Sequence, residues 1–222
     1  MKKFIWPEQQ SHSAFPIARP GYSFIFASAF VTAILAITGL KAFALLSLGI
    51  TIFICYFFRD PDRVCPEVEG GVISPADGKV VFAGPMESNP YFEGPCQKIS
   101  VFMSVFNVHV NRIPYDGKVK AIDYFPGKFF NASLDKASTD NERNAVTVEL
   151  KNGRCYTFVQ IAGLIARRII CGIKVGDNVS RGTRYGMICF GSRLDIYLPE
   201  DAKINVSNGE KVMAGFTVIA NL

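Results

Sequence analysis

The sequence predicts an α+β protein that is mostly β, in which an N-terminal hydrophobic helical hairpin precedes one β-rich domain. Residues 21–40 and 42–58 form two runs without a charged residue, and only Lys41 separates them. After residue 58 the chain changes to short stretches rich in β-branched and aromatic residues, divided by Gly, Pro, Asn and Asp. That alternation is typical of strands joined by turns.

The two apolar runs have the length of membrane helices. As helices, their 20 and 17 residues measure about 30 and 25 Å, close to the ~30 Å of a hydrocarbon core. Lys and Arg residues lie at both outer ends, so the positive-inside rule places both ends in the cytoplasm. We therefore expect residues 1–58 to anchor the protein in the cell membrane, with domain 59–222 on the cytoplasmic side. Whether the hairpin spans the bilayer or enters one leaflet is left open.

The composition excludes several function classes. A net charge of +5 comes from scattered Lys and Arg, without the basic stripe that binds nucleic acid. The two histidines, His12 and His109, belong to no Cys/His cluster with ligand spacing, so no metal site is expected. The six cysteines form no CxxC pair and are expected to be reduced and mostly buried.

The β-rich domain is expected to be a large antiparallel sheet folded on itself. Asn152-Gly153 is the clearest hairpin signal and suits a type I′ turn. The only fair helix candidate is IAGLIARRII, residues 161–170. The predicted strands are GGVISP, GKVVFAG, KISVFMSVFNVHVNRI, GKVKAIDYF, NAVTVELKNG, CYTFVQIAG and RYGMICFG.

His109 is one of few residues that could carry acid–base chemistry. It lies in VFMSVFNVHVNRIP, and strand alternation puts Asn107 and Asn111 on the same face as His109. A pocket wall and a satisfied core histidine both fit this pattern. Periodicity therefore leaves the role of His109 open.

A Gly-Ser pair, Gly191-Ser192, lies in CFGSRLDIYLP between two strand-like runs. By itself such a pair is a turn. Because Gly191 has no side chain, the Ser192 hydroxyl can approach the preceding carbonyl carbon and attack its own peptide bond. That reaction needs a base and strain.

Five segments together resemble the short form of the phosphatidylserine decarboxylase family. They follow the family's order over nearly the whole chain, and 31 residues, from Ser192 to Leu222, remain for a small pyruvoyl subunit. The segments are FFRDPDR, SPADGKV, FMSVFNVHVNRIP, QIAGLIARRI and GDNVSRGTRYGMICFGSRLDIYLP.

The resemblance implies autocatalytic cleavage between Gly191 and Ser192. The products would be a β chain, 1–191, and an α chain, 192–222, that stay together as a heterodimer; a higher oligomer is left open. Ser192 would become a pyruvoyl group, the covalent cofactor, whose ketone forms a Schiff base with the substrate amine. The implied reaction converts phosphatidylserine, a membrane phospholipid, to phosphatidylethanolamine and CO2.

The family's catalytic roles carry over onto three residues. His109 in NVHVNR matches the base of self-cleavage, and Asp77 in SPADGKV matches the carboxylate that orients it. With Ser192 they form a Ser-His-Asp arrangement. His109 is also the candidate donor for reprotonating the substrate. Without the resemblance, Asp77 fits an Asp-Gly turn.

Substrate-binding candidates are Arg167, Arg168 and Asn107. A guanidinium suits the lipid phosphate or the substrate carboxylate, and surface solvation is the equal alternative. Because the two arginines are adjacent, only one is expected to face the site. Arg59 and Arg63 are expected to meet anionic head groups.

One position departs from the longer bacterial enzymes of the family. They have LGST where this chain has FGSR, so that Arg193 replaces a small hydroxyl. The short branch carries Gly-Ser-Arg and includes enzymes with other lipid backbones. The serine head group is therefore better supported than the lipid chains, and a related lipid such as archaetidylserine is an alternative substrate.

Three other functions fit the pattern less well. A noncatalytic membrane-anchored β module, biotinyl-like, would use the turn-rich GGVISPADGKV and modify Lys79, but it leaves Gly191-Ser192 unexplained. A serine hydrolase acting on an external ester lacks G-x-S-x-G around Ser192. A zinc peptidase needs more histidines than the chain has.

Overall fold

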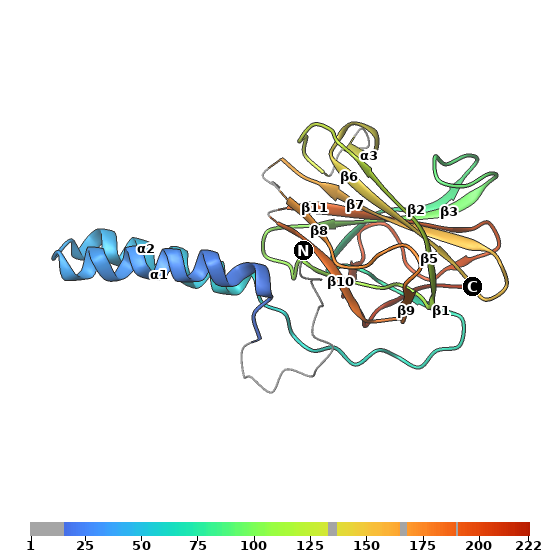
Figure 1. Ribbon diagram of the computed structural model, residues 1–222. Helices are drawn as coiled ribbons and strands as arrows, with labels where there is room; N and C mark the ends of the chain where they lie inside the picture. The colour runs from blue at the N-terminus through green and yellow to red at the C-terminus, as the bar shows by residue number, and fades with distance from the viewer. Residues whose placement is uncertain (1–15, 133–136, 165–167, 190) are drawn as a thin grey trace. The chain divides into compact units, whose positions relative to one another are not determined.

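The structure, a computed structural model, describes residues 16–132, 137–164, 168–189 and 191–222. These residues form two compact units, divided between Asp62 and Arg63. The unit before the division is helical, and the unit after it is built almost entirely of strands (Figure 1).

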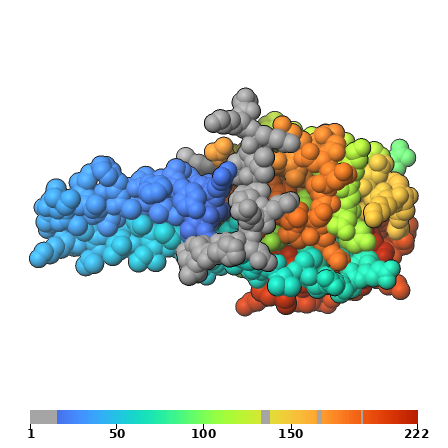
Figure 2. Space-filling model, turned by 60° about the horizontal axis from the view of Figure 1, so that its bottom comes forward, coloured from blue at the N-terminus to red at the C-terminus, as the bar shows by residue number. Residues whose placement is uncertain are grey.

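The first unit is a helical hairpin. A 3-10 turn, Arg19–Gly21, leads into helix α1, Tyr22–Ile37, and helix α2 follows as Lys41–Phe57. Gly39 has φ +79° in the turn, a conformation that glycine adopts without steric cost. Figure 2 shows α1 and α2 lying against each other along their length. The predicted helical hairpin is confirmed; α1 has 16 residues and is shorter than its apolar run, whereas α2 has 17 residues, the length of its run.

The hairpin places its hydroxyl groups between the helices and its apolar side chains outside. Thr32 Oγ1 lies 2.8 Å from Ser47 Oγ and 3.3 Å from Thr51 Oγ1. Large apolar side chains along both helices are solvent-exposed, which is the surface expected of helices that meet lipid. By length and composition, residues 19–37 are long and apolar enough to cross a membrane, whereas the 17 residues of α2 fall just short of that length.

The second unit is dominated by an eight-stranded sheet of order β13-β2-β3-β11-β7-β6-β5-β9. All neighbouring strands in it are antiparallel. The strands are β2 Gly78–Met86, β3 Cys96–Met103, β5 Gly117–Phe125, β6 Arg143–Glu149, β7 Cys155–Ala162, β9 Asn178–Val179, β11 Ser192–Pro199 and β13 Lys211–Val212. The expected mostly β fold with a curled antiparallel sheet is confirmed (Figure 1).

Two three-stranded sheets complete the unit, with orders β1-β14-β12 and β4-β10-β8. A short helix, α3, follows β5 in the chain. These elements are β1 Gly71–Ile73, β4 Val110–Arg112, α3 Ala137–Asp140, β8 Arg168–Cys171, β10 Arg184–Cys189, β12 Lys203–Ile204 and β14 Val218–Asn221.

Strand β11 runs through the middle of the large sheet, between β3 and β7, and is buried on both faces. Leu194 and Ile196 point into the main core, whereas Tyr197 packs in a smaller cluster on the other side. Each buried Leu or Ile contributes about 1.5–3 kcal/mol, so this strand is firmly held. Its first residue, Ser192, therefore begins a buried strand at the centre of the sheet.

The predicted strand through KISVFMSVFNVHVNRI is wrong in its middle. Strand β3 ends at Met103, and β4 begins only at Val110. Between them, Asn107 Oδ1 accepts hydrogen bonds from Ser104 N–H at 2.9 Å and from Ser104 Oγ at 2.8 Å. Such side-chain bonds compete with the strand ladder and close a turn. Strand alternation therefore does not decide which way His109 points.

The predicted β6–β7 hairpin is confirmed, but its turn type is not. Leu150 N–H donates to Arg154 O at 2.8 Å, and Gly153 N–H donates to Leu150 O at 3.0 Å. With Gly153 at φ +79°, this is a three-residue loop ending in a left-handed glycine rather than a two-residue type I′ turn.

The helix expected for residues 161–170 is also wrong where the structure describes it. Ile161 and Ala162 end strand β7, and Arg168 begins strand β8, which pairs with β10. The β-branched pair that follows Arg168 suits a strand with a partner beside it, and tertiary pairing overrides the helical periodicity.

Candidate active site

Ser192 lies at the beginning of the central strand β11. Its backbone neighbours across the sheet are Met103 of β3 and Ala162 of β7. The side chain is fully buried, and Oγ lies 3.3 Å from the Met103 sulfur. A thioether is a weak acceptor, so this hydroxyl is not held by a strong hydrogen bond to any described residue. It remains available for chemistry at the adjacent peptide bond.

Gly191 presents its carbonyl to strand β7. Its φ of +71° lies in the left-handed region, which L side chains rarely adopt. Open space surrounds its Cα, because the nearest atom to an added Cβ would be 4.0 Å away. The carbonyl oxygen accepts a hydrogen bond of 3.1 Å from Gly163 N–H. The backbone conformation, rather than crowding, therefore requires glycine at position 191.

His109 joins this pair from the segment between β3 and β4. The ring is fully buried, with Nδ1 2.9 Å from Asn107 O and Nε2 3.4 Å from Gly191 N. A carbonyl only accepts and an amide N–H only donates, so these two contacts favour the tautomer with the proton on Nδ1. In this tautomer Nε2, the nitrogen that can accept a proton, lies beside Gly191.

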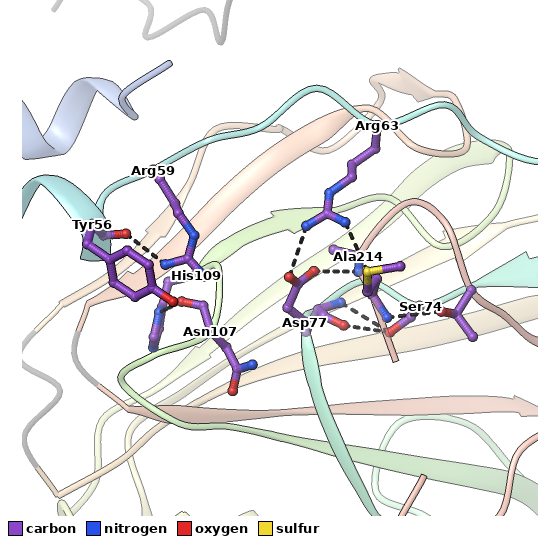
Figure 3. A network of polar contacts seen from close by, with 11 residues as sticks. Tyr56, Arg59, Arg63, Ser74, Asp77, Asn107, His109 and Ala214 are labelled. Carbon is purple, nitrogen blue, oxygen red and sulfur yellow. Dashed lines mark hydrogen bonds and ion pairs between the residues drawn. The ribbon is translucent and has the colours of Figure 1, made fainter. Parts of the chain in front are cut away.

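Asp77 lies in a different set of contacts. Its Oδ1 accepts a 2.7 Å hydrogen bond from Ala214 N–H, and its Oδ2 forms a 3.0 Å ion pair with Arg63 (Figure 3). The Nδ1 contact that the resemblance assigns to Asp77 is thus made by the Asn107 carbonyl. A role for Asp77 in orienting His109 stays a prediction. Arg63, expected at lipid head groups, instead neutralises this carboxylate.

The three substrate-binding candidates differ in how the structure places them. Asn107 uses its side-chain oxygen to close the turn at Ser104. Arg168 is exposed at the beginning of β8, opposite Cys189 of β10, which precedes the Gly-Ser pair by two residues. Arg167 lies outside the described residues. Arg168 is therefore the candidate whose positive charge is described, and that charge is exposed to solvent near the site.

A buried ion cluster lies directly beyond Ser192, and sequence reasoning missed its role. Arg193 Nε is 2.8 Å from Asp195 Oδ1, and the two residues are 2% and 0% exposed. Lys98 Nζ is 3.2 Å from Asp195 Oδ2, and Ser138 also contacts the cluster. Arg193 further donates to Ala132 O at 3.2 Å. The spacing of Arg193 and Asp195, two residues apart, puts both side chains on one face of a strand. That spacing is the sequence signal that could have predicted the ion pair.

A second missed feature is a pair of buried amides behind Met103. Gln160 Nε2 donates to Asn111 Oδ1 at 2.9 Å, and Asn111 Nδ2 lies 3.9 Å from the Met103 sulfur. Both amides are fully buried. They link β4, in one of the small sheets, to β7 of the large sheet, and no local sequence pattern marks them as partners.

The six cysteines are free thiols, as expected, but only Cys96 and Cys189 are buried and the other four are half-buried, so the expectation that most are buried is wrong. Cys189 lies closest in sequence to the Gly-Ser pair, and burial raises the pKa of its thiol from 9.0 to about 11. Among the described residues, the structure contains no group of three His, Cys, Asp or Glu side chains that could hold a metal ion.

Cys189 is expected to resist alkylation in the folded protein. At pH 8 its thiol is almost entirely protonated, and the thiolate is the reactive form. Because the folded pKa is the higher one, the neutral thiol stabilises the fold below pH 9, and this contribution is lost as the pH rises toward about 11. Iodoacetamide labelling followed by peptide mass spectrometry measures this. Labelling of folded Cys189 as fast as in denatured protein would contradict it.

The chain is similar to known proteins over most of its length. Residues 50–220 match the family model described as phosphatidylserine decarboxylase. A phosphatidylserine decarboxylase proenzyme from Syntrophotalea carbinolica is 51% identical over 207 residues, covering 93% of this chain and 97% of the relative. Proteins of the same name from Syntrophus aciditrophicus and Solidesulfovibrio magneticus are 51% and 53% identical, covering 92% of this chain and 96% and 95% of the relatives. The chain therefore belongs to the phosphatidylserine decarboxylase family and is a decarboxylase.

Proposed function

We propose that this chain is a proenzyme that cleaves itself between Gly191 and Ser192 and then decarboxylates phosphatidylserine to phosphatidylethanolamine. The observation that carries the proposal is the position of His109 Nε2 beside the Gly191 nitrogen, where the buried hydroxyl of Ser192 follows in the chain. The name proenzyme, given to the relatives, supports a precursor that matures by cleavage.

The proposed cleavage uses only groups of this chain and water. The Ser192 oxygen attacks the Gly191 carbonyl carbon while its proton passes to His109 Nε2. Collapse breaks the bond to the Ser192 nitrogen, which takes a proton, and leaves an ester. Loss of the α proton of residue 192 then breaks the ester and releases the Gly191 carboxylate. Water replaces the nitrogen, which leaves as ammonia, and residue 192 becomes a pyruvoyl group.

The surroundings of residue 192 fit a pyruvoyl group. It is small and uncharged like serine, and its position is fully buried beside a thioether. The group supplies an electron sink for the carbanion left when CO2 departs. His109 is proposed to return a proton to the substrate α carbon, and Asp77 to support the charged form of His109. Arg168 is the proposed contact for a substrate anion.

The sheet supports a stable two-chain product. Strands β11 to β14 would belong to the new chain, residues 192–222, and β11 lies between two strands of the larger chain. Strand β13 pairs with β2, and β14 pairs with β1. Backbone hydrogen bonds on several sides therefore hold the chains together as a heterodimer. The exposed apolar helices support attachment to the cell membrane, with the β unit proposed on the cytoplasmic side.

Intact-mass spectrometry of the wild-type protein beside Ser192→Ala tests the proposal. We expect a chain of residues 192–222 that is lighter than its serine-headed form by the mass of ammonia, together with a chain of residues 1–191. Ser192→Ala should remain one chain, because its methyl group cannot attack the Gly191 carbonyl. The wild type alone should release CO2 from phosphatidylserine in vesicles. A single unmodified wild-type chain in folded, detergent-solubilised protein would overturn the proposal.

A further inference from the structure

We infer that the backbone N–H of Gly163 stabilises the oxyanion that forms on the Gly191 carbonyl during self-cleavage. The inference rests on the proposed function, because it concerns the first step of that reaction. It assigns a catalytic contact to a residue without a side chain, at a position where the proposed mechanism otherwise has no electrophilic group.

The sheet register places Gly163 opposite Gly191. Ala162 pairs with Ser192 across β7 and β11, and the next antiparallel pair beyond the strand ends is Gly163 with Gly191. The N–H of Gly163 donates to Gly191 O at 3.1 Å. In most ladders such a bond only holds strands together. Here its acceptor is the carbonyl oxygen of the bond to be cleaved.

This hydrogen bond becomes stronger as the reaction proceeds. When Ser192 Oγ attacks, the carbonyl π electrons move onto Gly191 O, and a bond to a charged acceptor is roughly twice as strong as a neutral one. The donor is already in place and held by β7, so no reorganisation is needed at that moment. Gly163 is buried, and a low dielectric increases the effect.

The requirement for glycine at position 163 comes from this carbonyl. A Cβ on Gly163 would lie 2.3 Å from Gly191 O and 2.9 Å from Gly191 C, closer than real Cβ contacts. Gly163 is not among the glycines with positive φ, so its backbone conformation alone would accept another residue. The absent side chain thus lets the N–H of Gly163 approach the carbonyl of Gly191.

The proposed base and the proposed donor contact the two ends of the Gly191 backbone. His109 Nε2 lies at the Gly191 nitrogen, and Gly163 N–H lies at the Gly191 oxygen. Attack by Ser192 would create a positive charge on His109 and a negative charge on that oxygen. The positive charge then forms on the ring that takes the proton, and the negative charge forms beside the N–H of Gly163.

Gly163→Ala in the full chain tests the inference. A matched control is Gly117→Ala, because a Cβ there would lie 2.6 Å from Glu149 O in the same sheet. Gly117 belongs to β5, which β6 and β7 separate from β11. Both precursors are made by cell-free translation with detergent, and cleavage is followed over time by intact mass. We expect Gly163→Ala to cleave about 10²–10³-fold more slowly than wild type, and Gly117→Ala to cleave at the wild-type rate.

Hydroxylamine identifies the step that is slowed. It cleaves an ester but not the original peptide bond, so a variant blocked after ester formation would be cleaved on its addition. Gly163→Ala should show no such increase, because its first step is slow. Cleavage of Gly163→Ala at the wild-type rate, or an ester that hydroxylamine traps, would overturn the inference. A wild-type chain that never cleaves would instead overturn the proposed function.

A second variant separates the hydrogen bond from the fold. Translation with a tRNA charged with glycolic acid at position 163 replaces the N–H by an ester oxygen and adds no side chain. The Gly191 carbonyl then loses its donor without crowding. We expect the same slow cleavage between residues 191 and 192. Hydroxylamine is left out for this variant, because it would cleave the new ester between residues 162 and 163. Cleavage of this variant at the wild-type rate would overturn the inference even if Gly163→Ala does not fold.

Discussion

His109→Ala is expected to slow self-cleavage by about two to four orders of magnitude, the usual contribution of a positioned general base. The contacts of the ring favour Nε2 as the nitrogen that accepts a proton, because Nδ1 lies beside the acceptor Asn107 O and Gly191 N–H points at Nε2. Removing the ring leaves the proton of the attacking Ser192 hydroxyl without this acceptor. The rate is measured by intact mass on freshly translated precursor.

The other histidine of the chain, His12, gives the matched control for this prediction. His12→Ala should cleave at the wild-type rate. Because the His109 ring is fully buried, its removal also leaves a cavity, so thermal unfolding of His109→Ala is compared with that of Ser192→Ala. Wild-type cleavage by a folded His109→Ala precursor would exclude His109 as the base.

Asp195→Asn is expected to destabilise the β-rich unit by about 3–5 kcal/mol. The change leaves the guanidinium of Arg193, which is 2% exposed, and the ammonium of Lys98 without their shared anion. Desolvation of an unpaired buried charge is the dominant cost. Denaturant unfolding is measured in the Ser192→Ala background, so that a single chain unfolds.

A surface ion pair provides the matched control. Arg154 and Asp201 lie 2.6 Å apart, with side chains 39% and 69% exposed. Asp201→Asn removes the same charge type but should cost no more than about 1 kcal/mol, because water solvates the remaining arginine. Equal losses for Asp195→Asn and Asp201→Asn would show that burial does not control the energy of the Arg193–Asp195 pair.

The Arg193–Asp195 cluster also explains why Arg193 follows the nucleophile here. On β11 successive side chains point to opposite faces, so Ser192 faces Met103 while Arg193 points to the other side of the sheet. There Arg193 binds the carbonyl of Ala132 in the segment before α3. An arginine beside Ser192 therefore anchors a neighbouring segment and does not enter the site.

Local patterns predicted the features that depend on neighbours in the chain. Two uncharged runs around Lys41 predicted the helical hairpin, and Asn152-Gly153 predicted where β6 turns into β7. Where a local side-chain bond or a distant strand intervened, the predictions failed. Asn107 broke the expected strand, and pairing with β10 made a strand of the segment beginning at Arg168.

Residue type and short-range order were enough to predict the apolar hairpin, the β-rich character of the remaining chain, and Gly191-Ser192 as the chemically unusual pair. The tertiary structure alone decided which groups surround that pair. His109 Nε2 reaches Gly191 from 82 residues away, Gly163 N–H binds its carbonyl, and Asp77 binds Arg63 and Ala214. Such contacts depend on strand register, which packing of the whole sheet sets and no single segment encodes.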